Sequence, residues 1–250
     1  MLPPFVDQGW LAAHRASVVV ALVRRGPDDP QPVPGAVGVE LEGVLSGPDT
    51  GTTGRHPLPD PTSFAAGLSA AGIGDGSTVV AYDVVGGVFA ARLVWMLRAV
   101  GVAAALLDGG EPPAADGPAP GSTVLTPRPW PAERLADLLD GPDGADLVLD
   151  ARPRERFSGA PDPLDPRPGH VEGAVPLPAR ESLGEDGRLL PDAVLAQRFA
   201  DAGVTPDADV VAYCGSGVTA CHTLLVMEHL GLGQGRLYPG SWSQYGALRP

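Results

Sequence analysis

Short apolar runs alternate with glycine-containing turns along this chain, and the pattern predicts strands that each lead into a helix. Residues 18–23 form an apolar run of strand length, and so do residues 79–81 and 210–212. The last two runs end at a polar residue and a tight turn, after which an apolar helical segment continues to Gly101 or Gly231. Strands that alternate with helices predict an α/β fold of mainly parallel sheets flanked by helices.

The two halves of the chain follow the same plan, which predicts two domains of about 120 residues each. Residues 77–93 and 209–220 both give a strand, a tight loop and a helix, and each half then gives a short strand and a glycine turn. We place the boundary so that residues 1–118 form the first domain and residues 119–250 the second. The segment 111–131 is rich in Pro, Ala and Gly and is interpreted as a linker, in which residues 123–125 could add a strand.

The composition of the chain limits the classes of partner and the cellular setting that we expect for it. The chain has 17 Lys and Arg against 30 Asp and Glu, a net charge of −13, which argues against nucleic acid and anionic membranes as ligands. No apolar run approaches the length that spans a bilayer, and the N-terminus lacks the pattern of a secretion signal. Two cysteines cannot build a disulfide framework, so we expect a reducing, cytoplasmic setting. No His and Cys cluster has the spacing of metal ligands, and we expect no cofactor.

The strand at 210–213 ends at Cys214, and this position predicts a nucleophilic thiol. Two glycines, Gly215 and Gly217, follow at once, and a helix is expected over 221–230. Free N–H groups of a glycine-rich turn and of a first helical turn form an anion-binding nest, which favours a thiolate. The alternative is a buried structural cysteine, but a structural cysteine does not require flanking glycines that leave the backbone N–H groups accessible.

The loop after Cys214 also excludes one class of cysteine enzyme. Cysteine-dependent phosphatases hold the phosphoryl group with a guanidinium at the far side of such a loop, and residues 215–223 contain neither Arg nor Lys. A small loop of neutral donors suits a single extra atom on the sulfur, as in a persulfide, better than a tetrahedral phosphate.

The sequence Cys-Gly-Ser-Gly-Val-Thr at 214–219 resembles the active-site loop of the rhodanese (sulfurtransferase) superfamily, in the form typical of its 3-mercaptopyruvate sulfurtransferase branch. Further motifs match over nearly the whole chain, at 150–152, 156–157, 165–167 and 169–174. The resemblance implies two tandem rhodanese-like domains and transfer of sulfur from 3-mercaptopyruvate, or from thiosulfate, through a Cys214 persulfide to a thiol, a thioredoxin-like protein or cyanide. A thiosulfate sulfurtransferase and a non-enzymatic persulfide carrier in a sulfur relay remain the alternatives.

The same resemblance assigns roles to the residues around the thiol. Arg156 and Arg167 correspond to two arginines that bind the substrate carboxylate, a task that suits the planar guanidinium. The amides of Gly215, Gly217 and Val218 would hold the bound sulfur.

A proton relay is also implied. Ser216 corresponds to a serine that works with a histidine and an acid of the first domain, for which His56 and Glu42 are the candidates. Glu42 stands where the family usually has Asp. Thr219 could contact the sulfur or serve as the N-cap of the helix.

The two halves differ at the position of the predicted nucleophile, because the first half has Asp83 where the second has Cys214. A carboxylate cannot carry sulfur, so we expect a non-catalytic first domain, with Asp83 as a solvated capping residue. Cys221 is interpreted as a small core residue rather than as a resolving thiol.

Overall fold

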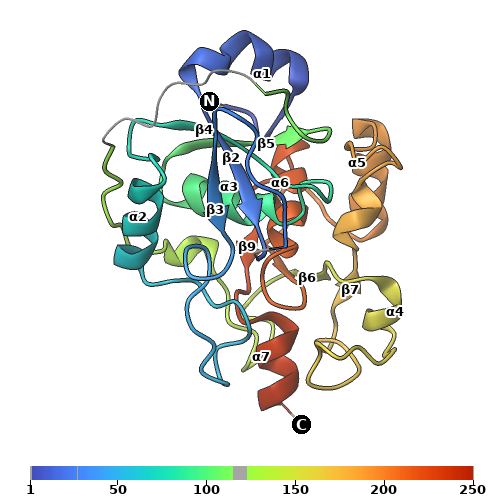
Figure 1. Cartoon of the computed structure of the whole chain (residues 1–250). Coiled ribbons are helices and arrows are strands. Elements are labelled where there is room, and N and C mark those ends of the chain that lie inside the picture. Colours follow the sequence, from blue (N-terminus) through green and yellow to red (C-terminus); the bar gives the residue numbers. More distant parts are fainter. Residues whose placement is uncertain (1, 27, 115–122, 250) are drawn as a thin grey trace. The chain divides into compact units, whose positions relative to one another are not determined.

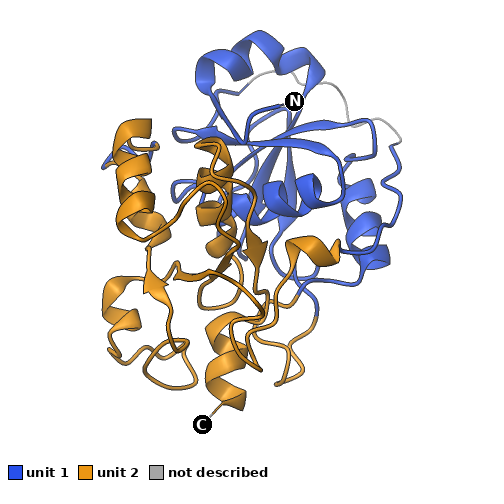
Figure 2. Cartoon of the chain, turned by 180° about the vertical axis from the view of Figure 1, so that it is seen from behind, with its two compact units in different colours: residues 1–47, 58–130, 185–188 blue, residues 48–57, 131–184, 189–250 orange. Residues whose placement is uncertain are grey.

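The computed structural model describes residues 2–26, 28–114 and 123–249, and the chain forms two compact units (Figures 1 and 2). Unit 1 comprises residues 1–47, 58–130 and 185–188, and unit 2 comprises residues 48–57, 131–184 and 189–250. The short segment 48–57 therefore belongs to the unit that contains Cys214. The domain boundary predicted between residues 118 and 119 lies outside the described residues.

Unit 1 is built on a five-stranded parallel sheet with the order β1-β5-β4-β2-β3. Its elements are β1 (Phe5–Asp7), α1 (Gln8–His14), the 3-10 helix η1 (Arg15–Ser17), β2 (Val19–Arg24), β3 (Ala36–Glu40), α2 (Pro61–Ala70), β4 (Thr78–Tyr82), α3 (Ala90–Ala99) and β5 (Ala103–Asp108).

Unit 2 is built on a four-stranded parallel sheet with the order β7-β6-β8-β9. Its elements are the 3-10 helix η2 (Ala132–Arg134), β6 (Leu147–Asp150), α4 (Arg154–Phe157), β7 (Val175–Pro176), the 3-10 helix η3 (Ala179–Ser182), α5 (Asp192–Asp201), β8 (Val210–Tyr213), α6 (Ala220–His229), β9 (Arg236–Leu237) and α7 (Ser241–Leu248).

Apart from the additional edge strand β1, the two sheets have the same strand order, β3-β2-β4-β5 in unit 1 and β7-β6-β8-β9 in unit 2, and these parallel sheets confirm the predicted fold class. In each unit, the strand that leads into the central helix pairs on both sides: β4 lies between β5 and β2, and β8 lies between β9 and β6. The residue that follows such a strand lies at the carboxyl edge of a parallel sheet, where α/β proteins place their ligands.

Both faces of the central strands are buried, as expected of a parallel sheet between helices. In unit 2, all four residues of β8 are fully buried, and Val211 and Tyr213 pack with Val148, Tyr238 and Trp242 in one cluster. Eight consecutive residues of α3, 90–97, and of α6, 220–227, are also buried. Because α6 is buried on all sides, its N-terminus and the loop before it are held in a fixed position.

The predicted ends of the two central helices are confirmed. Helix α3 stops at Ala99 and α6 at His229, and the chain leaves each helix through a glycine with positive φ, Gly101 at 82° and Gly231 at 71°. Only glycine adopts this conformation at little cost in free energy, so the ends of both helices could be predicted from the two glycines in the sequence.

The strand considered at 123–125 is wrong, because these residues form no ladder with either sheet. Their polar groups bond elsewhere: Leu125 N–H donates to Ser69 Oγ at 2.9 Å, and Asp75 N–H donates to the Val124 carbonyl at 3.1 Å. The prolines at 127, 129 and 131 lack the N–H groups that a longer ladder would need.

Within the described ranges, no helix combines the length and the apolar character that crossing a membrane requires.

Candidate active site

Cys214 is the first residue after β8, at the carboxyl edge of the unit 2 sheet, and it is only 2 % exposed. Its N–H donates to Ser241 Oγ at 3.1 Å, and its carbonyl accepts from Trp242 N–H at 3.0 Å. The next carbonyl, of Gly215, accepts from Ser243 N–H at 2.9 Å. The start of α7 therefore holds the backbone of Cys214 and Gly215 from one side.

This support is associated with a strained backbone at the first residue of α7. Ser241 has a φ of 52°, which is unfavourable for a residue with a side chain. Its buried hydroxyl donates to the Tyr238 carbonyl at 2.9 Å and accepts from Cys214 N–H, so tertiary bonds hold it in place. Ser241 was not identified from the sequence, because nothing local marks a serine that supports a strand 27 residues earlier.

The loop of residues 215–219 leads from Cys214 to the N-terminus of α6. Among the residues that the structure describes, no oxygen accepts a hydrogen bond from the N–H groups of Val218, Thr219 or Ala220. These groups lie at the positive end of the helix dipole. Thr219 takes the N-cap position, but its hydroxyl makes no capping bond, so the predicted cap role is wrong in this respect.

The matching loop of unit 1 demonstrates what such a backbone binds. There the carboxylate of Asp83 accepts four backbone hydrogen bonds: from Val85 at 2.8 Å, Gly87 at 2.7 Å, Phe89 at 2.8 Å and Ala90 at 2.9 Å. Asp83 is only 4 % exposed, so the expectation of a solvated residue is wrong, because the loop amides replace water around the charge.

The two loops can be aligned by counting residues back from the first residue of each helix, Ala90 in α3 and Ala220 in α6. Gly87 and Gly217 then share one position, and both have positive φ, 80° and 75°. The amides of Phe89 and Ala90, which bind Asp83, correspond to those of Thr219 and Ala220. Unit 1 fills its anion nest with its own carboxylate, whereas in unit 2 Cys214, with a shorter side chain, precedes the corresponding loop.

His56, which was expected in the first domain, lies in unit 2 next to Ser216. His56 Nδ1 is 2.7 Å from Ser216 Oγ, close enough for a strong hydrogen bond. The segment of His56 is attached to α7, because Arg55 N–H donates to Ser243 Oγ at 3.0 Å and Gln244 Nε2 donates to the Thr52 carbonyl at 2.8 Å. Glu42 lies in the turn after β3 of unit 1, and its part in a relay stays a prediction.

Two guanidinium groups meet at Gly215. A Cβ atom on this glycine would lie 3.2 Å from Arg156 Nη2 and 3.2 Å from Arg55 Nη2. Arg156 was predicted to serve the site, and Arg55 was missed although it directly precedes His56. The sequence signal, an arginine beside a candidate relay histidine, was present, but no local pattern brings residue 55 to residue 215.

Arg167 uses its guanidinium differently. Its carbon Cζ lies 4.9 Å from the ring centre of Trp242, and its Nε donates to the Gly246 carbonyl at 3.1 Å. Trp242 Nε1 in turn donates to the Arg167 carbonyl at 2.9 Å. These contacts bind Arg167 to α7, and its role in substrate binding stays a prediction.

A buried polar network supports the strand that carries Cys214. Arg152 and Asp150 form an ion pair at 2.7 Å, and Tyr213 donates to Asp150 at 2.5 Å. Burial raises the pKa of Tyr213, so its hydroxyl stays protonated and continues to donate. Val171 N–H donates to the same hydroxyl at 3.0 Å. These contacts give Asp150 and Arg152 a structural role.

Cys221 is fully buried in α6, and its Sγ lies 3.4 Å from the Gly217 carbonyl. This environment supports its interpretation as a small core residue that also supports the loop.

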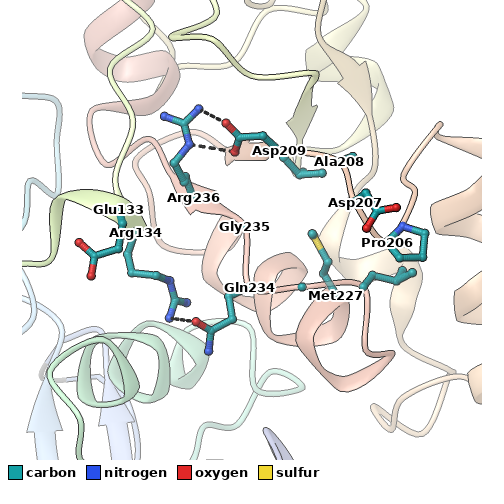
Figure 3. A pocket seen from close by; sticks show the side chains of 13 residues that line it. Glu133, Arg134, Pro206, Asp207, Ala208, Asp209, Met227, Gln234, Gly235 and Arg236 are labelled. Atoms are coloured by element: carbon teal, nitrogen blue, oxygen red, sulfur yellow. Dashed lines mark hydrogen bonds and ion pairs between the residues drawn. The ribbon is translucent and has the colours of Figure 1, made fainter.

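A cavity of about 520 Å³ lies at the other end of β8 (Figure 3). It is lined by Arg134, Asp209, Met227 and Arg236, and the last forms an ion pair with Asp209 at 2.7 Å. Val210 begins β8 and Cys214 follows its last residue, so the cavity and the thiol are separated by about the length of the strand, roughly 13 Å. The cavity is therefore not part of the thiol site.

Comparisons with known proteins agree with the geometry of unit 2. The family model described as a rhodanese-like domain matches residues 131–248. A Pseudomonas aeruginosa protein named "Probable 3-mercaptopyruvate sulfurtransferase" is 44% identical over 230 residues, which cover 85% of this chain and 80% of that protein. An Arabidopsis thaliana protein named "Thiosulfate/3-mercaptopyruvate sulfurtransferase 2" is 31% identical, with 96% of this chain and 78% of that protein covered.

A solved structure is also similar. The 3-mercaptopyruvate sulfurtransferase from Leishmania major superposes with a TM-score of 0.83 at 28% identity, over 99% of this chain and 75% of that one.

Proposed function

Because the chain belongs to the rhodanese family and is a sulfurtransferase, we propose that Cys214 accepts sulfur from 3-mercaptopyruvate as a persulfide and then delivers it to a thiol. The observation that carries the proposal is the position of Cys214 at the end of β8, directly before a loop and helix start in which the N–H groups of Val218, Thr219 and Ala220 have no oxygen acceptor among the described residues. The corresponding loop of unit 1 supports the same interpretation, because its backbone N–H groups bind an anion, the carboxylate of Asp83.

The first half-reaction forms one bond and breaks another. The Cys214 thiolate attacks the donor sulfur, the new S–S bond forms, and the C–S bond of 3-mercaptopyruvate breaks. The electron pair of the C–S bond passes to carbon as the enolate of pyruvate, which takes up a proton. In this proposal, Ser216 delivers that proton with His56 behind it, because the 2.7 Å contact allows the hydroxyl to be resupplied from the imidazole.

The second half-reaction returns the enzyme to its starting state. An acceptor thiolate attacks the outer sulfur, and the Cys214 thiolate leaves. This is covalent catalysis with ping-pong kinetics. We propose a small thiol or a thioredoxin-like protein as the acceptor, and a reducing compartment such as the cytoplasm as the setting, in which Cys214 remains a thiol.

Unit 1 takes no covalent part in this scheme, because Asp83 stands at the position of the nucleophile and its carboxylate is fully engaged by the loop. The choice of 3-mercaptopyruvate over thiosulfate follows the absence of Arg and Lys from residues 215–223 and the name of the Pseudomonas aeruginosa relative. Thiosulfate is the second candidate, since the Arabidopsis thaliana relative is named for both donors.

The test compares Cys214→Ser with Cys221→Ser. Steady-state turnover with each donor, followed with cyanide as the acceptor, is expected to vanish in Cys214→Ser and to persist in Cys221→Ser. Intact mass of the wild-type protein after donor treatment should rise by one sulfur atom, and only when Cys214 is present. Turnover by Cys214→Ser would refute the proposal, and loading without turnover would favour the non-enzymatic carrier.

A further inference from the structure

We infer that Ser243 is a positioning residue for His56: its hydroxyl, with Gln244 as a second anchor, fixes the segment 48–57 and so holds the imidazole against Ser216. This role rests on the proposed function, because it concerns the proton that is delivered in that reaction. Ser243 lies in the first turn of α7, and its bonds go to backbone atoms of three different parts of unit 2.

Ser243 connects the loop after β8 to the segment that carries His56. Its N–H donates to the Gly215 carbonyl at 2.9 Å, and its hydroxyl accepts from Arg55 N–H at 3.0 Å. Gly215 directly precedes Ser216 in the chain, and Arg55 directly precedes His56. One residue therefore holds the backbone beside each of the two groups that meet at 2.7 Å.

The segment 48–57 contains no helix or strand, so individual contacts determine where it lies. Gln244 Nε2 donates to the Thr52 carbonyl at 2.8 Å. A Cβ atom on Gly54 would lie only 2.5 Å from the Gly240 carbonyl oxygen, so the chain passes tightly against the start of α7. The residues just before His56 are therefore fixed to α7 at several neighbouring points.

The backbone of His56 is restricted from both sides. Arg55 N–H is bonded to Ser243 Oγ, and Pro57 has a fixed φ and disfavours the helical conformation for the residue before it. Proton transfer requires heavy atoms within roughly 2.6–3.2 Å of each other, so a backbone shift of about 1 Å would separate His56 from Ser216. The relay therefore depends on the Ser243 hydroxyl as well as on the imidazole.

The two serines at the start of α7 contact different parts of the site. Ser241 Oγ accepts from Cys214 N–H at 3.1 Å, whereas the Ser243 hydroxyl accepts from Arg55 N–H and donates to the Gly240 carbonyl at 3.1 Å. An alanine at position 243 keeps the N–H that bonds the loop after β8. Loss of the Ser243 hydroxyl should therefore leave the thiol in place and disturb only the delivery of the proton.

Two reactions of Cys214 differ in their need for that proton. When the C–S bond of 3-mercaptopyruvate breaks, its electron pair passes to carbon, the proton comes from the Ser216 hydroxyl, and the His56 imidazolium resupplies the hydroxyl. When the Cys214 thiolate attacks iodoacetamide, the C–I bond breaks and iodide leaves with the electron pair and without a proton. A displaced imidazole should slow the first reaction and leave the second unchanged.

The test compares Ser243→Ala with the wild-type protein in both reactions. Without an acceptor, the rate constant for release of pyruvate in one turnover at saturating 3-mercaptopyruvate measures the donor half-reaction alone. It should fall by about 10- to 100-fold in Ser243→Ala, as expected for a misplaced general acid. The rate of alkylation of Cys214 by iodoacetamide, followed by mass, should not change. An equal fall in both rates, or no fall in either, would overturn the inference.

Two variants serve as references. Ser158→Ala removes a hydroxyl from an exposed serine of the same unit and should change neither rate. Ser243→Thr keeps a hydroxyl at the same position and should retain most of the rate of pyruvate release. A threonine variant as slow as the alanine variant would count against the role of the hydroxyl.

A double-mutant cycle shows whether Ser243 acts through His56. Ser243→Ala should slow pyruvate release in the wild-type protein but not in the His56→Gln variant, because the relay is already lost there. Equal factors in both backgrounds would overturn the inference. If Ser243→Ala does not fold, Gln244→Ala, which removes the second anchor, replaces it in the same cycle and is judged by the same two outcomes.

Loading of Cys214 separates this inference from the proposed function. The mass of the wild-type protein after treatment with 3-mercaptopyruvate shows directly whether one sulfur atom is gained. Without that gain, the proposed function fails and the role of Ser243 fails with it. A gain of sulfur together with equal factors in the cycle overturns the role of Ser243 alone.

Discussion

The four hydrogen bonds to Asp83 make a sharp prediction for the substitution Asp83→Asn. Asparagine has nearly the same shape, so no cavity forms, but its amide offers one oxygen where the carboxylate offers two. Two of the four N–H groups, either those of Val85 and Gly87 or those of Phe89 and Ala90, would then face an NH₂ group. A buried donor without an acceptor costs about 1–3 kcal/mol, and the two remaining bonds weaken when their acceptor becomes neutral. Unit 1 should lose about 3–6 kcal/mol, a large part of the stability of a typical domain.

Urea unfolding followed by tryptophan fluorescence measures this loss. Three of the four tryptophans, Trp10, Trp95 and Trp130, belong to unit 1, so the signal reports mainly on the unit that carries the substitution. The two units can unfold in separate steps, and the transition of unit 1 is the one to fit. Asp28→Asn is the control, because it makes the same charge change at an exposed residue of unit 1. If both variants unfold at the same urea concentration, the loop does not depend on an anion, and the analogy between Asp83 and the Cys214 site fails.

Three further predictions concern unit 2. Tyr213→Phe removes the hydroxyl that donates to Asp150 and should destabilise the unit by about 1–3 kcal/mol in urea unfolding; an unchanged midpoint would contradict the role of this network. Burial lowers the pKa of His222 to about 4. Below pH 6.5, His222 is therefore protonated in the unfolded chain but stays neutral in the folded chain, so the free energy of unfolding falls as the pH falls. Between pH 6.5 and 5 this loss should be about 2 kcal/mol, and His222→Gln should remove it; equal pH slopes in both proteins would show that His222 is not the cause. Gly54→Ala should destabilise the unit by at least about 2 kcal/mol and slow turnover, because its Cβ atom would collide with backbone atoms. Gly51→Ala is the control and should cost about 1 kcal/mol, because Gly51 has a similar positive φ but no atom near the position of a Cβ. Equal losses of stability in the two variants would show that the close approach at Gly54 is not needed.

The sequence determined what depends on neighbouring residues. The strands at β4 and β8, the glycine ends of α3 and α6, and the position of Cys214 between a strand and a helix all follow from apolar runs and from glycines, because burial and positive φ are properties of a short segment. The parallel α/β class follows as well, since a strand that leads into a helix must return to the sheet.

Only the tertiary structure decided which distant side chains meet. Residues 48–57 carry no helical or strand period, so nothing in their sequence predicts that they join unit 2, yet they bring Arg55 to Gly215 and His56 to Ser216. The same holds for Ser241, whose hydroxyl accepts from the N–H of Cys214, and for Arg167, which packs on Trp242. Sequence patterns report the surroundings of each segment, whereas the partner of a side chain 100 residues away depends on how loops without any periodicity are fixed by individual hydrogen bonds.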